Sequence, residues 1–193
     1  TISFVMKLIL DSTFSKISYF NELFETAEYD TCVFDSCTFI KTTLSKSVFT
    51  NCEFINCNFE TPFVSHTSFK EVTFQECTIL GLQFEYCNDF LFEVSFDSCM
   101  LQVCSFFKMN LKNSKFKDSK IIDVDFTNAT LSGVKFDNCD LSKSIFDATN
   151  LEKTDFSSAF HFSIDPEKNK LSKTKFSNEN LSGLLNKYDL DII

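Results

Sequence analysis

The sequence predicts an all-β fold in which extended chain turns a corner every five residues, followed by a short C-terminal helix. Three observations lead to this prediction: an unbroken five-residue period of apolar positions, small residues two places before each of them, and a final segment with helical spacing. The 193 residues are enough for one domain with a real core, or at most for two small ones. Only 3 glycines and 2 prolines are present, which argues against a fold built from many tight hairpins.

Apolar residues recur at every fifth position over most of the chain. A first series runs from Phe14 to Phe84 and a second from Leu91 to Phe156, and neither contains a polar slot. Between them the register slips by two residues within Glu85–Asp89, which we interpret as a bulge or small protruding loop between coils, with a functional loop as the alternative. At 44% apolar residues overall, chance would produce such a run with a probability of roughly 10⁻¹⁰.

This period fits neither a helix, which repeats every 3.6 residues, nor a strand, which repeats every 2. In extended chain a central residue i and residue i−2 point to the same side, so the chain must turn near i+1 and i+2 before the next centre. The i−2 residues are small, as at Cys32, Cys57, Ala129 and Ser144. We therefore expect each repeat to point one large apolar and one small side chain inward.

The repeat resembles that of the pentapeptide-repeat family, whose pattern is small, polar, Leu or Phe, polar, variable. The segments ATLSG (129–133), CDLSK (139–143) and SIFDA (144–148) match it closely, and the resemblance covers roughly residues 12–160. It implies a right-handed quadrilateral β-helix with four pentapeptides in each coil of twenty residues. The slots then fill about seven to eight coils, a rod ~35–40 Å long. In its second half, alternating Phe and Leu place Phe on two opposite faces.

The repeats end near residue 160, so we divide the chain into a β-helix (1–160) and a C-terminal turn and capping or dimerisation helix (161–193). Pro166 marks the turn. A helix is predicted from Ser177, a good N-cap residue, although Gly183 weakens it by roughly 1 kcal/mol relative to Ala. It must dock on something to be stable, as a cap on the last coil, a dimer interface or both. Its apolar face consists of Leu181, Leu184, Leu185 and Tyr188.

The tail, DPEKNK…LSGLLNKYDLDII, is also similar to the ending of the quinolone-resistance (Qnr) and microcin-immunity members of the family. Those proteins act on DNA gyrase and topoisomerase IV, dimerise through C-terminal elements and imitate duplex DNA with acidic rods. The resemblance implies a homodimeric DNA-mimic ligand of a type II topoisomerase that protects it against quinolone-type or peptide poisons. The alternative is a general protein–protein interaction scaffold with a non-topoisomerase partner.

Two outward columns of the predicted rod are candidate interaction surfaces. The net charge of −9 disfavours direct binding of nucleic acid or anionic membrane. Duplex DNA as long as the rod carries ~20–24 charges, and the net charge of −9 is less than half of that. An ordinary solvated face is therefore the other interpretation of the acidic column. The acidic interaction face consists of Asp35, Glu53, Glu76, Asp97, Asp118, Asp137 and Asp155, with Lys16, Lys115, Lys117 and Lys135 among them. The apolar outward column, a candidate protein contact, consists of Phe20, Ile40, Leu80, Met100 and Ile122.

The chain contains no motif for catalysis or cofactor binding. His66 and His161 lie far apart, and there is no Gly-rich phosphate loop, HExxH motif or nucleophile elbow. We therefore expect no catalytic residues, no metal and no cofactor. No run of 18 apolar residues exists, so no membrane span is expected, and the first residues do not resemble a signal peptide.

All nine cysteines occupy position i−2. An odd number fits poorly with a purely disulfide-paired secreted protein, so we expect reduced thiols in a cytoplasmic chain. Zinc needs ligands that converge tetrahedrally, whereas thiols stacked ~4.8 Å apart on successive coils point in parallel. Parallel Cβ atoms also stay farther apart than the ~3.8 Å of a disulfide. We predict nine small buried thiols that fill a narrow ladder.

Overall fold

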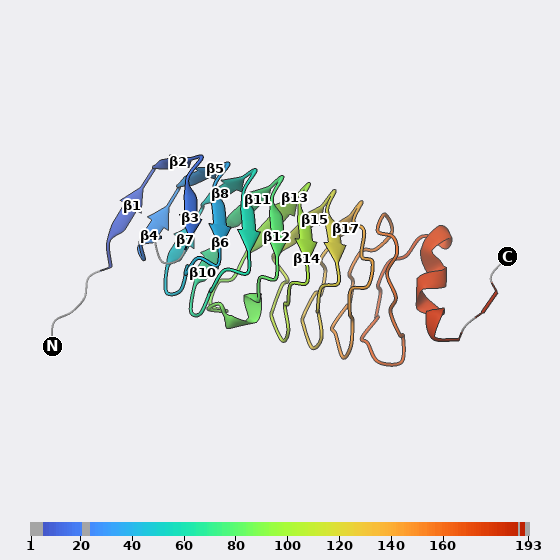
Figure 1. Ribbon diagram of the computed structural model, residues 1–193. Helices are drawn as coiled ribbons and strands as arrows, with labels where there is room; N and C mark the ends of the chain where they lie inside the picture. The colour runs from blue at the N-terminus through green and yellow to red at the C-terminus, as the bar shows by residue number, and fades with distance from the viewer. Residues whose placement is uncertain (1–5, 21–23, 189, 192–193) are drawn as a thin grey trace.

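The computed structural model describes residues 6–20, 24–188 and 190–191, which form a rod of stacked coils (Figure 1). Strands twenty residues apart pair in parallel, as Phe34 does with Phe54 and Phe54 with Phe74. Four faces, here named A to D in chain order, make up each coil. The predicted β-helix with a short C-terminal helix is confirmed.

Three faces carry parallel sheets. Their strand orders are β1-β4-β7-β10 on face A, β17-β15-β13-β11-β8-β5-β2 on face B and β16-β14-β12-β9-β6-β3 on face C. Face D is joined by isolated parallel bridges from Thr43 to Phe63 and along Gln83, Ser105, Asp125 and Ile145. The elements are β1 (Leu8–Leu10), β2 (Thr13–Ser15), β3 (Ser18–Phe20), β4 (Glu28–Asp30), β5 (Val33–Asp35), β6 (Thr38–Ile40), β7 (Val48–Thr50), β8 (Glu53–Ile55), β9 (Asn58–Glu60), β10 (Ser68–Lys70), β11 (Val72–Gln75), β12 (Thr78–Leu80), β13 (Val94–Asp97), β14 (Met100–Gln102), β15 (Lys115–Lys117), β16 (Lys120–Ile122) and β17 (Phe136–Asp137), with 3-10 helices η1 (Phe84–Tyr86), η2 (Asn178–Leu184) and η3 (Asn186–Tyr188).

The corners are residues with positive φ at position i+2, where the sequence pattern placed the turn. Asn51 and Asn56, for example, both have φ 52°. This conformation is unfavourable for L-residues, but the next coil stabilises it: the N–H of Asn51 donates to the carbonyl oxygen of Lys70 at 3.0 Å. The fold therefore turns many corners with few glycines.

Phenylalanine rings form continuous columns inside the rod. On face B the rings stack at 4.8–5.5 Å between centroids, with interplanar angles of 6–21°. In the second half, Phe106, Phe126 and Phe146 form a second column on face D, opposite face B. The predicted placement of Phe on two opposite faces is confirmed. The face B column consists of Phe14, Phe34, Phe54, Phe74, Phe96, Phe116, Phe136, Phe156 and Phe176.

The two extra residues lie slightly later than expected. Ser68 still bridges to Asn88, twenty residues on, but Thr73 pairs with Ser95, twenty-two residues on. Leu91, predicted to be the first inward slot of the second series, is 63% exposed, and the slot is filled by the buried Phe92. Leu91 has φ 56° and thus forms a corner, which turns its side chain outward.

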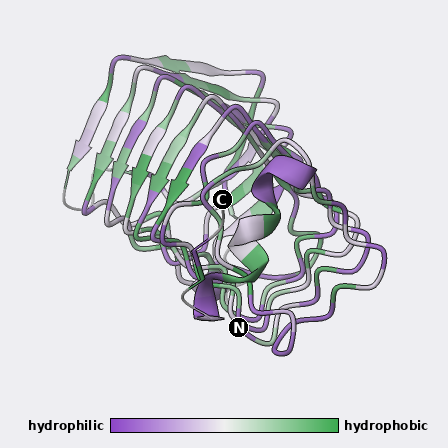
Figure 2. Cartoon of the chain, turned by 90° about the vertical axis from the view of Figure 1, so that its right-hand side faces the viewer, coloured by the Kyte–Doolittle hydropathy of each residue, from purple (hydrophilic) through white to green (hydrophobic). Residues whose placement is uncertain are grey.

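The C-terminal segment lies across the last coil as 3-10 turns (Figure 2). Its docked side contains Asn180, whose side-chain amide donates to the carbonyl oxygens of Phe156 at 2.8 Å and Ala159 at 2.9 Å. Gly183 is also buried there. A 3-10 helix has a different residue period from an α-helix, and of the face expected from α-helical spacing only Leu184 packs against the core. In the described part of the chain, no helix is long and apolar enough to cross a membrane.

Candidate interaction surfaces

The seven residues of the acidic interaction face lie on face B or at the corner after it. Asp35, Asp97 and Asp137 directly follow a stacked Phe of that face. Glu53 lies in β8, Asp155 bridges to Lys135, and Glu76 and Asp118 are corner residues. The coils therefore bring these carboxylates together along one side of the rod.

Lysines neutralise the C-terminal half of this column. Nζ of Lys117 lies 3.0 Å from Asp97 and 3.4 Å from Asp118. Nζ of Lys135 lies 2.9 Å from Asp137. The hydrogen bond from Lys117 lowers the pKa of Asp97, and the one from Lys135 lowers the pKa of Asp137. Asp155 in turn lies 3.7 Å from the ammonium of Lys175.

The N-terminal half keeps unpaired charge. Asp35, Glu53 and Glu76 form no ion pair with any residue that the structure describes. The face is thus acidic toward the N-terminus and mixed in sign toward the C-terminus, which the column of acidic letters alone did not indicate.

The apolar outward column lies on face C. Strand pairing places Phe20, Ile40, Glu60, Leu80, Gln102 and Ile122 in one row. Phe20 and Met100 are exposed, whereas Ile40, Leu80 and Ile122 are half-buried. Val103, at the next corner, adds an exposed apolar side chain that the sequence reasoning did not include.

Sequence reasoning also missed an aromatic patch on face D. Phe63 and Tyr86 are both more than 60% exposed and line a cavity of ≈ 280 Å³ together with Pro62 and Gly81. Phe90, in the insertion, is similarly exposed. The available signal was the phase of the repeat, because Phe63 occupies the outward slot just before the central Val64.

The predicted C-terminal apolar face is mostly open. Leu184 packs partly against the core, while Leu181, Leu185 and Tyr188 are exposed. The side with Asn180 and Gly183 therefore caps the coil together with Leu184, whereas Leu181, Leu185 and Tyr188 remain exposed.

The nine cysteines are free and buried, as predicted. The thiol of Cys57 donates to the carbonyl oxygen of Phe34 at 3.2 Å, and Cys77 donates to that of Phe54 at 3.2 Å. Burial raises the pKa of Cys52 and of Cys104 to about 12. Within the described ranges, no group of three or more His, Cys, Asp or Glu is arranged to hold a metal ion.

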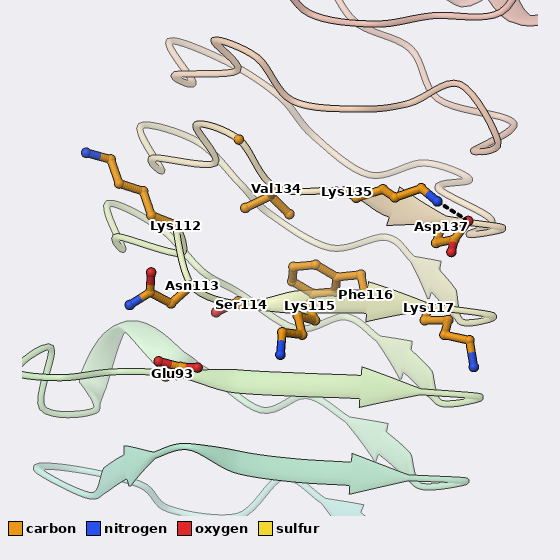
Figure 3. A pocket seen from close by; sticks show the side chains of 11 residues that line it. Glu93, Lys112, Asn113, Ser114, Lys115, Phe116, Lys117, Val134, Lys135 and Asp137 are labelled. Carbon is orange, nitrogen blue, oxygen red and sulfur yellow. Dashed lines mark ion pairs between the residues drawn. The ribbon is translucent and has the colours of Figure 1, made fainter.

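A further groove crosses the corner between faces A and B, with a volume of ≈ 710 Å³ (Figure 3). Several lysines line it, and three of them belong to the face on which the acidic column lies. The sequence reasoning noted Lys115, Lys117 and Lys135 only as charges interspersed with the acidic residues. It did not predict the groove, because the groove depends on the insertion and on a corner glycine.

Comparisons with known proteins agree with this architecture. A family model described as "Pentapeptide repeat region" matches residues 47–126, and one described as "Pentapeptide repeats (8 copies)" matches residues 32–61 and 125–160. No curated protein sequence matches the chain significantly.

Several solved structures are also similar. A trypsin-treated variant of QnrB1, "a plasmid-mediated fluoroquinolone resistance protein", matches with a TM-score of 0.73 and 14% identity, covering 98% of this chain and 100% of that one. Full-length QnrB1 matches with a TM-score of 0.42 and 14% identity, covering 95% of this chain and 100% of that one. HetL, a pentapeptide repeat protein from the cyanobacterium Nostoc, matches at 0.37 with 13% identity, covering 91% and 87%. Only the first match supports an argument, and at this identity it concerns the fold alone.

Proposed function

The chain belongs to the pentapeptide-repeat family, and we propose that it is a non-catalytic ligand of a type II topoisomerase, DNA gyrase or topoisomerase IV, that protects this enzyme in the cytoplasm against quinolone-type or peptide poisons. One observation carries the proposal: the rod matches a fluoroquinolone-resistance protein over the whole length of both chains and has a line of carboxylates along one face.

In this proposal the acidic interaction face occupies the enzyme's basic DNA-binding groove. Successive coils place carboxylates at intervals of ~4.8 Å or its multiples, and complementary potentials speed encounter and fix orientation. Asp35, Glu53 and Glu76 contribute most, because none of them forms an ion pair with a described residue. The paired half contributes less, which limits the imitation of DNA to part of the rod.

We also propose a homodimer through the exposed side of the C-terminal segment. Leu181, Leu185 and Tyr188 present apolar surface at the end of the rod. A twofold contact there joins two rods end to end and doubles the length of acidic surface.

The test is gyrase supercoiling and fluoroquinolone-induced DNA cleavage in the presence of the purified protein. We expect protection that weakens steeply as salt rises and is lost in a variant with Asp35→Asn, Glu53→Gln and Glu76→Gln. The matched control removes the same charge from face A by Glu28→Gln, Asp30→Asn and Glu71→Gln, and should keep protection. The absence of both protection and inhibition at micromolar concentrations would exclude the proposed target.

The second candidate function is a protein–protein interaction scaffold with a different partner. The observation that favours it is the apolar outward column: pairing keeps Phe20, Ile40, Leu80 and Ile122 in one row along face C, with Met100 in the neighbouring row. In that case Ile40→Lys and Ile122→Lys abolish partner capture, whereas the acidic-face variants do not. Affinity capture with these variants separates the two functions.

A further inference from the structure

The groove between faces A and B combines a cluster of lysines with a buried hydroxyl group that has no partner (Figure 3). It spans three successive coils. Lys112, Asn113, Ser114 and Lys115 come from the middle coil, Gly133 and Lys135 from the next one, and Glu93 from the preceding one.

The unpartnered hydroxyl belongs to Ser114, which is 4% exposed and whose Oγ has no hydrogen-bond partner among the described residues. Four other i−2 hydroxyls in the second half donate to the carbonyl oxygen 23 residues earlier, while Ser119 donates to that of Lys117 at 2.7 Å. Ser144 donates to Ile121 at 2.7 Å in this way, and Thr149 to Phe126 at 2.9 Å.

The insertion explains why Ser114 lacks such an acceptor. The residue 23 positions earlier is Leu91, a corner with φ 56° rather than a regular inward slot. A buried polar group without a partner is unfavourable, and this one lies in the lining of the groove, where Figure 3 shows it beside Asn113.

A glycine keeps the groove open. Gly133 has φ 80°, and no atom lies within 4 Å of the position that a Cβ would take there. The corresponding positions of neighbouring coils carry a side chain, Asn113 before it and Lys153 after it. The space is therefore left by the backbone and is not filled by the protein itself.

The lining is positive on a protein whose net charge is −9. Lys112, Lys115, Lys117 and Lys135 line the groove, against the carboxylates of Glu93 and Asp137. Lys117 and Lys135 already pair with aspartates. Lys112 and Lys115 have no ion pair with a described residue, so their charge remains available to a ligand.

We propose that this groove binds a phosphate-type oxyanion, free or carried by a small molecule. Lys112 and Lys115 supply the charge, the Asn113 amide donates beside them, and the Ser114 hydroxyl provides a further donor at the base. The volume is in the range of small-molecule sites, ~300–1,000 Å³. A nucleic acid is disfavoured, because the carboxylates along face B repel an extended polyanion. The site does not depend on the proposed topoisomerase function, to which Asp35, Glu53 and Glu76 in the other half of the face contribute most.

The experiment is isothermal titration of the full chain with inorganic phosphate, with AMP and with duplex DNA. We expect phosphate and AMP to bind, and Lys112→Gln with Lys115→Gln to weaken binding about tenfold or more. The matched control, Lys120→Gln with Lys143→Gln, removes equal charge elsewhere and should change affinity less than about twofold. If AMP binds more tightly than phosphate, the site is assigned to a phosphorylated small molecule. If the two bind equally, it is assigned to the free anion.

Ser114→Ala provides a second variant that should fold. Because its buried hydroxyl has no protein partner, removing it should keep or raise the melting temperature, whereas Ser144→Ala should lower it. Ser114→Ala should still weaken phosphate binding about threefold or more. Any one of three results would overturn the proposal: no binding at millimolar phosphate and AMP, equal losses in the two lysine pairs, or duplex DNA as the tightest ligand through these same lysines.

Discussion

The ring of Phe162 occupies the space that a side chain on Gly183 would need: its Cε2 atom lies 2.5 Å from where a Cβ of residue 183 would be. The carbonyl oxygen of Gly183 also accepts a hydrogen bond from the N–H of Ile164 at 2.9 Å. Glycine is thus required for contact between η2 and the last coil. Since the ring of Phe162 packs on that of Phe156 at 5.5 Å, this contact closes the end of the core.

We predict that Gly183→Ala destabilises the protein. Helix propensity alone would stabilise it by roughly 1 kcal/mol, but overpacking against Phe162 costs about 1–3 kcal/mol. The midpoint of urea unfolding should therefore fall. Ser182→Ala, at an exposed neighbour, is the control and should stay within about 0.5 kcal/mol. A higher midpoint for Gly183→Ala would contradict this packing.

Phe126→Ala should reduce the free energy of unfolding by about 3–5 kcal/mol. The ring is fully buried and lies between Phe106, at 5.4 Å, and Phe146, at 5.1 Å. Neighbouring coils cannot close the cavity, because the backbone ladder fixes their spacing. Ile145→Ala, on the exposed side of the same segment, should cost far less. Similar losses for both variants in urea unfolding would refute the column as the main source of stability.

The buried thiols should make stability fall at alkaline pH. Burial raises the pKa of Cys52, Cys104 and Cys139 to about 12, compared with ~8.5 in an unfolded chain. Below the unfolded pKa both states hold the proton and stability is unaffected. As pH rises above ~8.5 the unfolded chain loses protons that the folded chain retains, so the free energy of unfolding decreases until the folded pKa is reached.

Two measurements check this alkaline loss. Urea unfolding between pH 7 and pH 10 should show a declining free energy of unfolding, and the decline should be smaller in Cys104→Ala. Native protein at pH 8 should also react slowly with a thiol reagent, whereas unfolded protein exposes every thiol. Rapid labelling of the native state would show that the ladder opens.

The proposed homodimer should dissociate when the exposed side of the C-terminal segment is charged. Leu185→Glu with Tyr188→Glu places like charges across a twofold contact, and sedimentation should report a monomer. Leu8→Glu with Leu10→Glu alters equally exposed leucines at the other end and should leave the dimer intact. A wild-type protein that sediments as a monomer at tens of micromolar would remove the dimer from the proposal.

Most of the fold was predictable because every repeat follows the same pattern of inward and outward positions. Each coil between the first and the last has a buried centre equivalent to Phe54 and a small buried residue equivalent to Cys52. The environment of one such pair therefore predicts that of the others. The C-terminal segment was only partly predictable. Its helix and Ser177 start were expected, but the docked side depends on Phe162 and on carbonyl groups of the last coil, which local spacing does not reveal.

The candidate surfaces divide in the same way. The twenty-residue coil length predicted that Asp35 and Glu53 share one face and that Ile40 and Leu80 share another, since columns follow from coil length alone. Which carboxylates are neutralised depends on the reach of lysine side chains between coils, as from Lys117 to Asp97.

The sequence by itself determined the coil, the interior columns and the free state of the cysteines, because these follow from a period that every repeat must satisfy. Only the tertiary structure decided how coils meet where the period fails. Phe90 and Leu91 turn outward, Ser114 loses its acceptor, and Gly133 leaves a groove beside it. Each of these features depends on contacts between residues about twenty positions apart, at places where the repeat no longer specifies which residues of successive coils are neighbours.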